Sequence, residues 1–254
     1  MNEINSELLK YKRTFTRKLI VLIPLFFSIQ AAAGVSLMPK YIVRTWDLVI
    51  AMAFNVWAVI FLPFGMALFA FLVDNQERKS GNYRSLLTRN NSPVYIWISK
   101  IIVMAFHTLL SSCVLVIAIL ISGMITAKGQ IPLKQIITAS LVSWTVSLIL
   151  IPIQLWAATW KGLFPSMALG FIGFIAGIVS ALTSYWFLIP WAWGIRLMSP
   201  IIGVHPNGTL LEDGDKLLDT SVIPVGIVIS LLTLIIIIMI TALWFNRREI
   251  KWSD

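Results

Sequence analysis

Six long apolar stretches restrict this chain to a small number of folds. They cover residues 19–38, 48–73, 101–126, 135–159, 163–188 and 222–244, and each reaches the length of about 20 residues that a helix needs to cross a bilayer. A helix satisfies its backbone hydrogen bonds within the segment, which lipid requires. We therefore expect an all-α, polytopic membrane protein of about six transmembrane helices, with residues 1–254 forming a single transmembrane domain.

The composition agrees with a membrane protein. Only 12% of the residues are charged and 58% are hydrophobic, whereas soluble domains carry about 25% charged residues. Cys113 is the one cysteine, so an internal disulfide and a CxxC metal site are both excluded. The net charge of +9 suits loops that face anionic lipid headgroups, and no basic face of a soluble fold supports binding to nucleic acid.

The basic residues also predict an orientation. If both termini are cytoplasmic, 14 of the 20 Lys and Arg residues lie in cytoplasmic segments and 6 lie outside, as the positive-inside rule requires. Before the first span, Leu8, Leu9, Tyr11 and Phe15 lie among basic residues. This pattern favours an N-terminal helix in the cytoplasmic interface, and the alternative is a solvated basic tail that only sets the topology.

The longest polar interruption, residues 74–100, predicts a docking element. Gly81 permits a sharp turn, and Tyr83, Leu86 and Leu87 follow at helical spacing on one face. Pro93 ends this pattern before the next span. A short helix with an apolar face and basic flanks has little to pack against within such a chain, so we expect it to bind another protein at the cytoplasmic surface.

The segment of residues 189–221 is expected outside, and its apolar first half contains too many prolines and glycines for another span. We expect that half to dip into the outer interface, with Trp191 and Trp193 at headgroup depth. The second half is acidic and could meet a cationic amphiphile, although a plain solvated loop is the alternative. The candidate acidic residues are Glu212, Asp213, Asp215 and Asp219.

Enzymatic chemistry has little support in this sequence. It contains no HExxH, GxSxG or GxxxxGK[ST] motif and no pair of aspartates within a span. His107 is the one titratable side chain well inside a span, and without an acidic partner it is best interpreted as a hydrogen-bonded packing residue. We therefore expect no catalytic residue, no metal site and no ATPase activity in this chain.

The loop that begins near residue 74 resembles the first cytoplasmic loop of permease subunits of type-2 ABC exporters. The residues that carry the resemblance are Glu77, Gly81, Leu86-Leu87, Pro93 and Lys100. The family usually has Thr after the glycine, where this chain has Asn82. Within that family, the opening ELLKYKRTFTRKLIVLIPLF resembles the lantibiotic-immunity permeases of the EpiE/MutE group.

The resemblance implies a half-transporter in a bacterial cell membrane that expels a cationic antimicrobial peptide (a lantibiotic) to the outside. Its partners would be a dimer of ATP-binding subunits, which hold ATP and Mg, and a second permease chain, identical or a sister. A coupling helix would contact the ATPase through the ionic groups of Glu77 and Arg84, and Leu86 and Leu87 would fill a groove of the ATPase. Closure of the ATPase dimer would move this helix, Tyr83 included. The alternative is a non-transporting scaffold or sensor subunit that recruits a cytoplasmic partner through the same loop.

Overall fold

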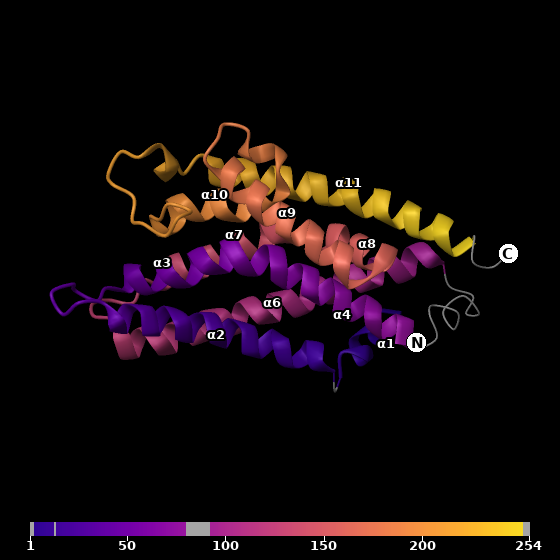
Figure 1. Ribbon diagram of the computed structural model, residues 1–254, viewed down its shortest axis with the longest axis horizontal. Coiled ribbons are helices and arrows are strands. Elements are labelled where there is room, and N and C mark those ends of the chain that lie inside the picture. The colour runs from indigo at the N-terminus through magenta and orange to yellow at the C-terminus, as the bar shows by residue number, and fades with distance from the viewer. Residues whose placement is uncertain (1–2, 13, 80–91, 251–254) are drawn as a thin grey trace.

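The protein is an elongated bundle of helices that run roughly along its long axis (Figure 1). The structure, a computed structural model, describes residues 3–12, 14–79 and 92–250, and no β-strand forms within these ranges. Both ends of the described chain lie at the same end of the bundle, here named the terminal end. The loops of residues 38–45, 127–132 and 203–221 lie at the opposite, distal end.

The described chain is almost entirely helical, with its longest described loop at residues 203–221. In chain order the elements are α1 (Glu3–Lys10), α2 (Phe15–Leu37), α3 (Trp46–Val56), η1 (Trp57–Gly65), α4 (Met66–Lys79), α6 (Pro93–Thr126), α7 (Leu133–Ser147), α8 (Leu150–Lys161), α9 (Leu163–Ala181), η2 (Trp186–Leu188), α10 (Pro190–Ile202), η3 (Lys216–Leu218) and α11 (Val222–Ile250). Helix α2 packs along α6, α4 packs on α8, and α9 lies between α8 and α10.

The expectation of about six membrane-spanning segments is confirmed for the described residues. Five helical segments are long and apolar enough to cross a bilayer: Phe15–Leu37, Trp46–Lys79, Pro93–Thr126, Leu163–Ala181 and Val222–Arg248. The pair α7 and α8, bent by 43°, makes a sixth if it is one broken span. The chain is therefore a multi-pass, all-helical membrane protein.

Two of these spans contain a proline at an irregular point. Helix α7 ends at Ser147 and α8 begins at Leu150, because the ring of Pro152 crowds the carbonyl of Leu148 and provides no N–H to it. In the second span, the nine residues of η1 form a π-helix that contains Pro63. A π-helix of this length is unusual, and π-turns are frequent at functional sites.

The fifth span is shorter than predicted. We expected residues 163–188, but α9 ends at Ala181. The hydroxyl of Thr183 explains the end, because it donates to the carbonyl of Ser180 at 2.9 Å and accepts from the N–H of Tyr185 at 3.2 Å. Such local side-chain bonds compete with helix continuation.

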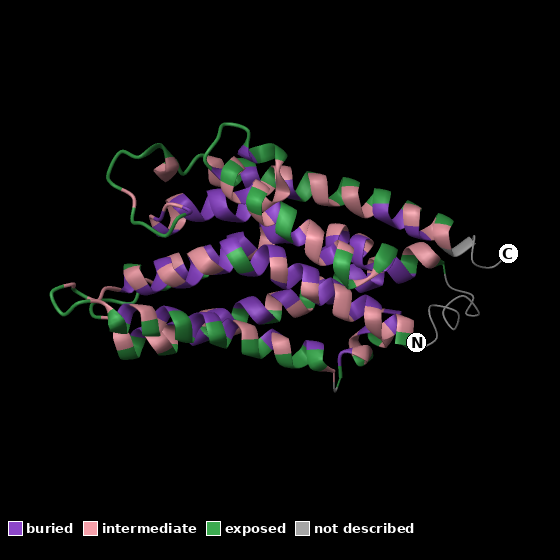
Figure 2. Cartoon of the chain, viewed as in Figure 1, coloured by how far each residue is buried: buried purple, intermediate pink, exposed green. Residues whose placement is uncertain are grey.

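Helix α10 is packed among other helices of the bundle, and the expected dip of this segment into the outer interface stays a prediction. Its 13 residues reach about 20 Å, too short to cross a bilayer. The helix packs against α7 and α9 and is mostly buried (Figure 2). Trp193 is 1% exposed and its indole donates to the carbonyl of Phe187 at 3.0 Å, so protein covers this ring on all sides.

The buried stripe of α9 consists of small residues, which lets neighbouring backbones approach closely. Its members are Ser166, Gly170, Gly173, Gly177 and Ala181. The ring of Trp191 covers Gly173, and the carbonyl of Pro63 faces Gly170. The spacing Gly173-x-x-x-Gly177 thus serves close packing of α9 on α10, as small-residue motifs do between helices in membranes.

Replacing Gly170 by Ala tests this packing. An added Cβ would lie 2.9 Å from the backbone oxygen of Pro63, so α9 or η1 has to shift, and we expect a loss of about 1–3 kcal/mol. Gly34→Ala is the control, because its Cβ would meet the flexible end of Met52. Thermal unfolding in detergent should show a clearly lower Tm for Gly170→Ala than for Gly34→Ala. An equal drop in both variants contradicts the packing argument.

Candidate functional site

Four charged side chains meet at the terminal end, where α1 crosses the ends of α4 and α6 that flank residues 80–91. The Lys100 ammonium lies 2.6 Å from Glu77 Oε1 and 3.2 Å from Glu7 Oε1. The Lys10 ammonium lies 2.6 Å from Glu7 Oε1 and also pairs with Glu77. Each carboxylate thus contacts both ammonium groups. We name Glu7, Lys10, Glu77 and Lys100 the four-charge clamp.

The clamp is largely removed from solvent. The side chain of Lys100 is 0% exposed, those of Glu7 and Glu77 are 2% and 6% exposed, and that of Lys10 is 24% exposed. Removing one partner from such a group leaves an uncompensated buried charge, which costs about 3–5 kcal/mol. Burial alone would lower the pKa of the Lys10 ammonium, but the charges of Glu7 and Glu77 outweigh burial and raise this pKa above its ordinary value.

Further contacts hold α1 against the bundle. The Gln76 amide donates to the Lys10 carbonyl at 2.7 Å, and the ring of Tyr11 stacks on His107 with 3.8 Å between the centroids. His107 Nδ1 also lies 2.7 Å from the Val103 carbonyl, which agrees with its interpretation as a hydrogen-bonded packing residue.

The N-terminal helix therefore exists, and the residues predicted for its apolar side divide between the bundle and the outer surface. Tyr11 is buried and Leu8 packs partly on the core. Glu3, Glu7 and Tyr11, spaced four residues apart, face the protein. Leu9 is 46% exposed and Phe15 is 60% exposed. Glu7 faces the bundle because its carboxylate finds a counter-charge there. The position of the helix in the membrane interface stays a prediction.

A second set of contacts secures the end of α8. Arg78 pairs with Asp74 at 2.5 Å and donates to the carbonyls of Thr159 and Ala158 at 2.7 Å and 3.2 Å. Arg248 of α11 donates to the same Thr159 carbonyl. Cations suit the last carbonyls of a helix, where the helix dipole is negative. Helices α4, α8 and α11 are thus tied together at the terminal end.

The predicted coupling residues divide between the described and the other residues. Gly81, Tyr83, Arg84, Leu86 and Leu87 lie outside the described residues. Glu77 is described, and its carboxylate contacts lysines of its own chain. Direct contact of Glu77 with an ATPase stays a prediction, and the structure adds an internal role.

Sequence reasoning missed the clamp because its members are far apart in the chain. Glu7 and Lys100 are separated by 93 residues, and no local pattern pairs them. One signal was available: charged residues near the ends of apolar spans need compensation. The spacing of Glu7 and Lys10 by three residues also suggested one helix face.

At the distal end, the buried Arg196 of α10 contacts the loop of residues 203–221, here named the acidic loop. Its guanidinium donates to the carbonyls of Leu217 and Lys216 at 2.9 Å and 3.3 Å. Burial lowers the pKa of Arg196, and the charges of Asp219 and Asp215 oppose this shift. The loop is therefore attached to the interior of the bundle through one cation.

The four predicted acidic residues have different surroundings. Asp215 Oδ1 accepts from the N–H of Leu217 at 2.8 Å, and Asp219 Oδ1 accepts from the N–H of Ser221 at 2.9 Å. The bonds from Ser221, with the charge of Arg196, lower the pKa of Asp219. Glu212 and Asp213 are exposed, and within the described residues no hydrogen bond or ion pair engages their carboxylates. These two can meet a ligand from outside, whereas Asp215 and Asp219 shape the loop.

Trp191 and Trp193 do not join the acidic residues in one surface. Trp191 packs on Gly173 and Gly177 of α9, and Trp193 is buried. Trp193 is therefore not accessible to a ligand, whereas Trp191 is half-buried.

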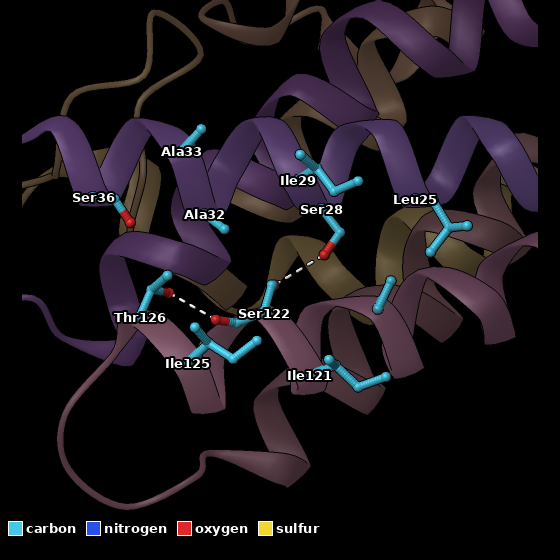
Figure 3. Close-up of a pocket in the computed structure, with 11 residues that line it drawn as sticks. Leu25, Ser28, Ile29, Ala32, Ala33, Ser36, Ile121, Ser122, Ile125 and Thr126 are labelled. Atoms are coloured by element: carbon cyan, nitrogen blue, oxygen red, sulfur yellow. Dashed lines mark hydrogen bonds between the residues drawn. The ribbon is translucent and has the colours of Figure 1, made fainter.

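A groove of about 350 Å³ lies between α2 and α6 near the distal end (Figure 3). Three of its four hydroxyl groups are bonded within the chain: Ser28 donates to Ser122 at 2.9 Å, Ser122 to the Ile119 carbonyl at 3.2 Å, and Thr126 to the Ser122 carbonyl at 2.8 Å. Ser36 is the fourth. The rest of its wall consists of alanine, leucine and isoleucine side chains. It offers apolar contact and no charge for a cationic ligand.

A comparison with protein families matches residues 3–177 to the family described as ABC-2 family transporter protein. The matched residues include more than half of the chain and all four members of the clamp. No curated protein and no solved structure matches the chain.

The packing of α1 predicts how stability responds to alkaline pH. Burial and the charge of Glu7 raise the pKa of the Tyr11 phenol above its ordinary value of about 10. Above about pH 10 the unfolded chain ionises this phenol and the folded protein does not, so stability is lost as the pH rises. Tyr11→Phe keeps the ring on His107, and we expect its Tm to fall less steeply between about pH 9 and about pH 11. Tyr41→Phe, at a ring that is 85% exposed, should follow the wild type, and equal slopes for all three proteins contradict this prediction.

Proposed function

The chain belongs to the ABC-2 family of transporter proteins and is a membrane permease subunit, and from this premise we propose that it expels a cationic antimicrobial peptide of the lantibiotic class. The peptide would leave the membrane for the outside and the cell would gain immunity. Members of this family generally lack an ATPase of their own, and the sequence has no P-loop. A dimer of ATP-binding subunits would therefore bind ATP and Mg and supply the energy.

The coupling part of this proposal depends on one observation: residues on either side of the segment 80–91 form an ion pair. Glu77 lies shortly before these residues and Lys100 shortly after them, and the two side chains pair at 2.6 Å. Force applied to residues 80–91 would reach α4 and α6 together. Gly81, Tyr83, Arg84, Leu86 and Leu87 are the proposed contacts to the ATPase, with the terminal end in the cytoplasm.

The acidic loop at the distal end supports the choice of a cationic substrate. Glu212 and Asp213 are exposed there, at the opposite end of the bundle from α1 and the end of α4. Opposite charge raises the rate at which a peptide reaches such a surface. A second permease chain, identical or a sister, would complete the pathway between the two ends.

Co-purification tests the transporter directly. The chain is expressed with its neighbouring genes, extracted in mild detergent, and assayed for ATP hydrolysis with and without purified lantibiotics. We expect a nucleotide-binding partner whose turnover rises with peptide. If the partner is a kinase or a synthase, or if no partner elutes, the chain is a scaffold or sensor and the export proposal fails.

Exchanging Leu86 and Leu87 for Asp tests the coupling helix. Two charges in an apolar groove would remove most of the peptide-stimulated ATP hydrolysis, because each buried unpaired carboxylate costs several kcal/mol. Leu210→Asp is the control, at a leucine of the distal loop that is 54% exposed. Unchanged stimulation in the double variant, with normal membrane insertion, would show that these leucines do not meet the ATPase.

Neutralising the exposed carboxylates tests substrate capture. Glu212→Gln with Asp213→Asn should raise the peptide concentration needed for half-maximal stimulation by about 2- to 5-fold per charge, since an exposed ion pair contributes about 0.5–1 kcal/mol. The effect should shrink at high salt. Asp47→Asn removes an exposed carboxylate of the same end and should change little. Identical half-maximal concentrations in all variants would exclude the loop as the receiving surface.

A further inference from the structure

The two charges that α1 adds to the clamp are not needed to neutralise it. Glu77 and Lys100 already form a neutral pair at 2.6 Å. Helix α1 contributes one carboxylate and one ammonium, so the net charge of the buried group stays at zero. What α1 changes is the number of links, because Glu7 contacts Lys100 of α6 and Lys10 contacts Glu77 of α4.

We propose that Glu7 and Lys10 are positioning residues for transport, which make α1 move as one body with the ends of α4 and α6. This inference rests on the function proposed above, because it assumes that the ATPase acts near residues 80–91. Helix α1 ends at Lys10 and α2 begins at Phe15, so few residues separate them, and α2 packs along α6. Motion delivered to α4 and α6 would therefore reach the first span through α1.

The burial of the links makes them stiff enough for this role. Glu7 and Lys100 are almost fully buried, so water does not compete for their charges and the pairs hold a defined geometry. The bond from Gln76 to the Lys10 carbonyl and the stack of Tyr11 on His107 add one attachment on α4 and one on α6. A helix that only lies in the membrane interface needs none of these attachments to the bundle.

The chain offers a variant that separates positioning from charge balance. Glu7→Gln alone leaves two ammonium groups on one carboxylate and should lower both Tm and coupling. Glu7→Gln with Lys10→Gln restores neutrality and keeps the pair of Glu77 with Lys100. The double variant should therefore recover most of the Tm lost in the single variant, and its coupling should stay low.

Coupling is measured as peptide-stimulated ATP hydrolysis of the whole complex in vesicles of anionic phospholipid. In the double variant we expect the stimulated turnover to fall by about 5-fold or more, the lower bound of common coupling energies, with an unchanged peptide KM. Lys12→Gln is the control, because Lys12 is exposed and outside the clamp. Wild-type coupling in the double variant overturns the inference, as does a parallel change of coupling with Tm. A wild-type complex that does not respond to peptide instead contradicts the proposed function.

A cross-link gives a test that does not depend on folding of the charge variants. Tyr11, the residue directly after α1, contacts His107 of α6. Both are replaced by cysteines in a Cys113→Ser background and joined by a bifunctional thiol reagent that a reductant cleaves. If α1 and α6 move together, the joined protein keeps its peptide stimulation. Loss of stimulation on joining, with recovery on reduction, overturns the inference.

Discussion

Lys100 carries a charged ammonium group into a part of the bundle where its side chain is fully buried, and the carboxylates of Glu7 and Glu77 compensate it there. A buried ion of this kind is tolerable only with good geometry and opposite charge close by. That requirement brings α1, α4 and α6 to one point. Arg78 and Arg248 then extend the same principle to the carbonyls at the end of α8, so charged side chains connect α1, α4, α6, α8 and α11 in the described part of the terminal end.

The middle of the bundle is held differently. Close approach of α9 to α10 and η1 depends on glycines that leave room for Trp191 and for the Pro63 carbonyl. The spans next to this region contain a π-helix and a 43° bend, which interrupt regular α-helical hydrogen bonding. The ion pairs hold the helices of the terminal end together, and the interruptions give the spans places to bend. This combination suits a protein in which one end moves as a unit while the spans change their packing.

The sequence predicted the features that depend on length and local composition. The six spans and the all-helical fold follow from hydropathy, because lipid permits few alternatives. The sequence did not predict where charged partners meet, since Glu7 and Lys100 lie in separate segments of the chain. It also did not predict that protein covers the ring of Trp193, because an apolar segment broken by proline and glycine has the same composition at a membrane interface and inside a bundle. The end of α9 was missed because it depends on the hydroxyl bonds of Thr183.

The most direct measurement is the distance between spin labels in the assembled transporter, without nucleotide and with ATP trapped. Labels at Leu9 and Tyr95, both exposed on α1 and α6, report on the terminal end, and labels at Leu9 and Leu210 span the two ends. The account predicts that the first distance stays within about 2 Å while the second changes. If the distance from Leu9 to Tyr95 changes with nucleotide while the distance from Leu9 to Leu210 stays constant, α1 and α6 do not move together and the account is contradicted.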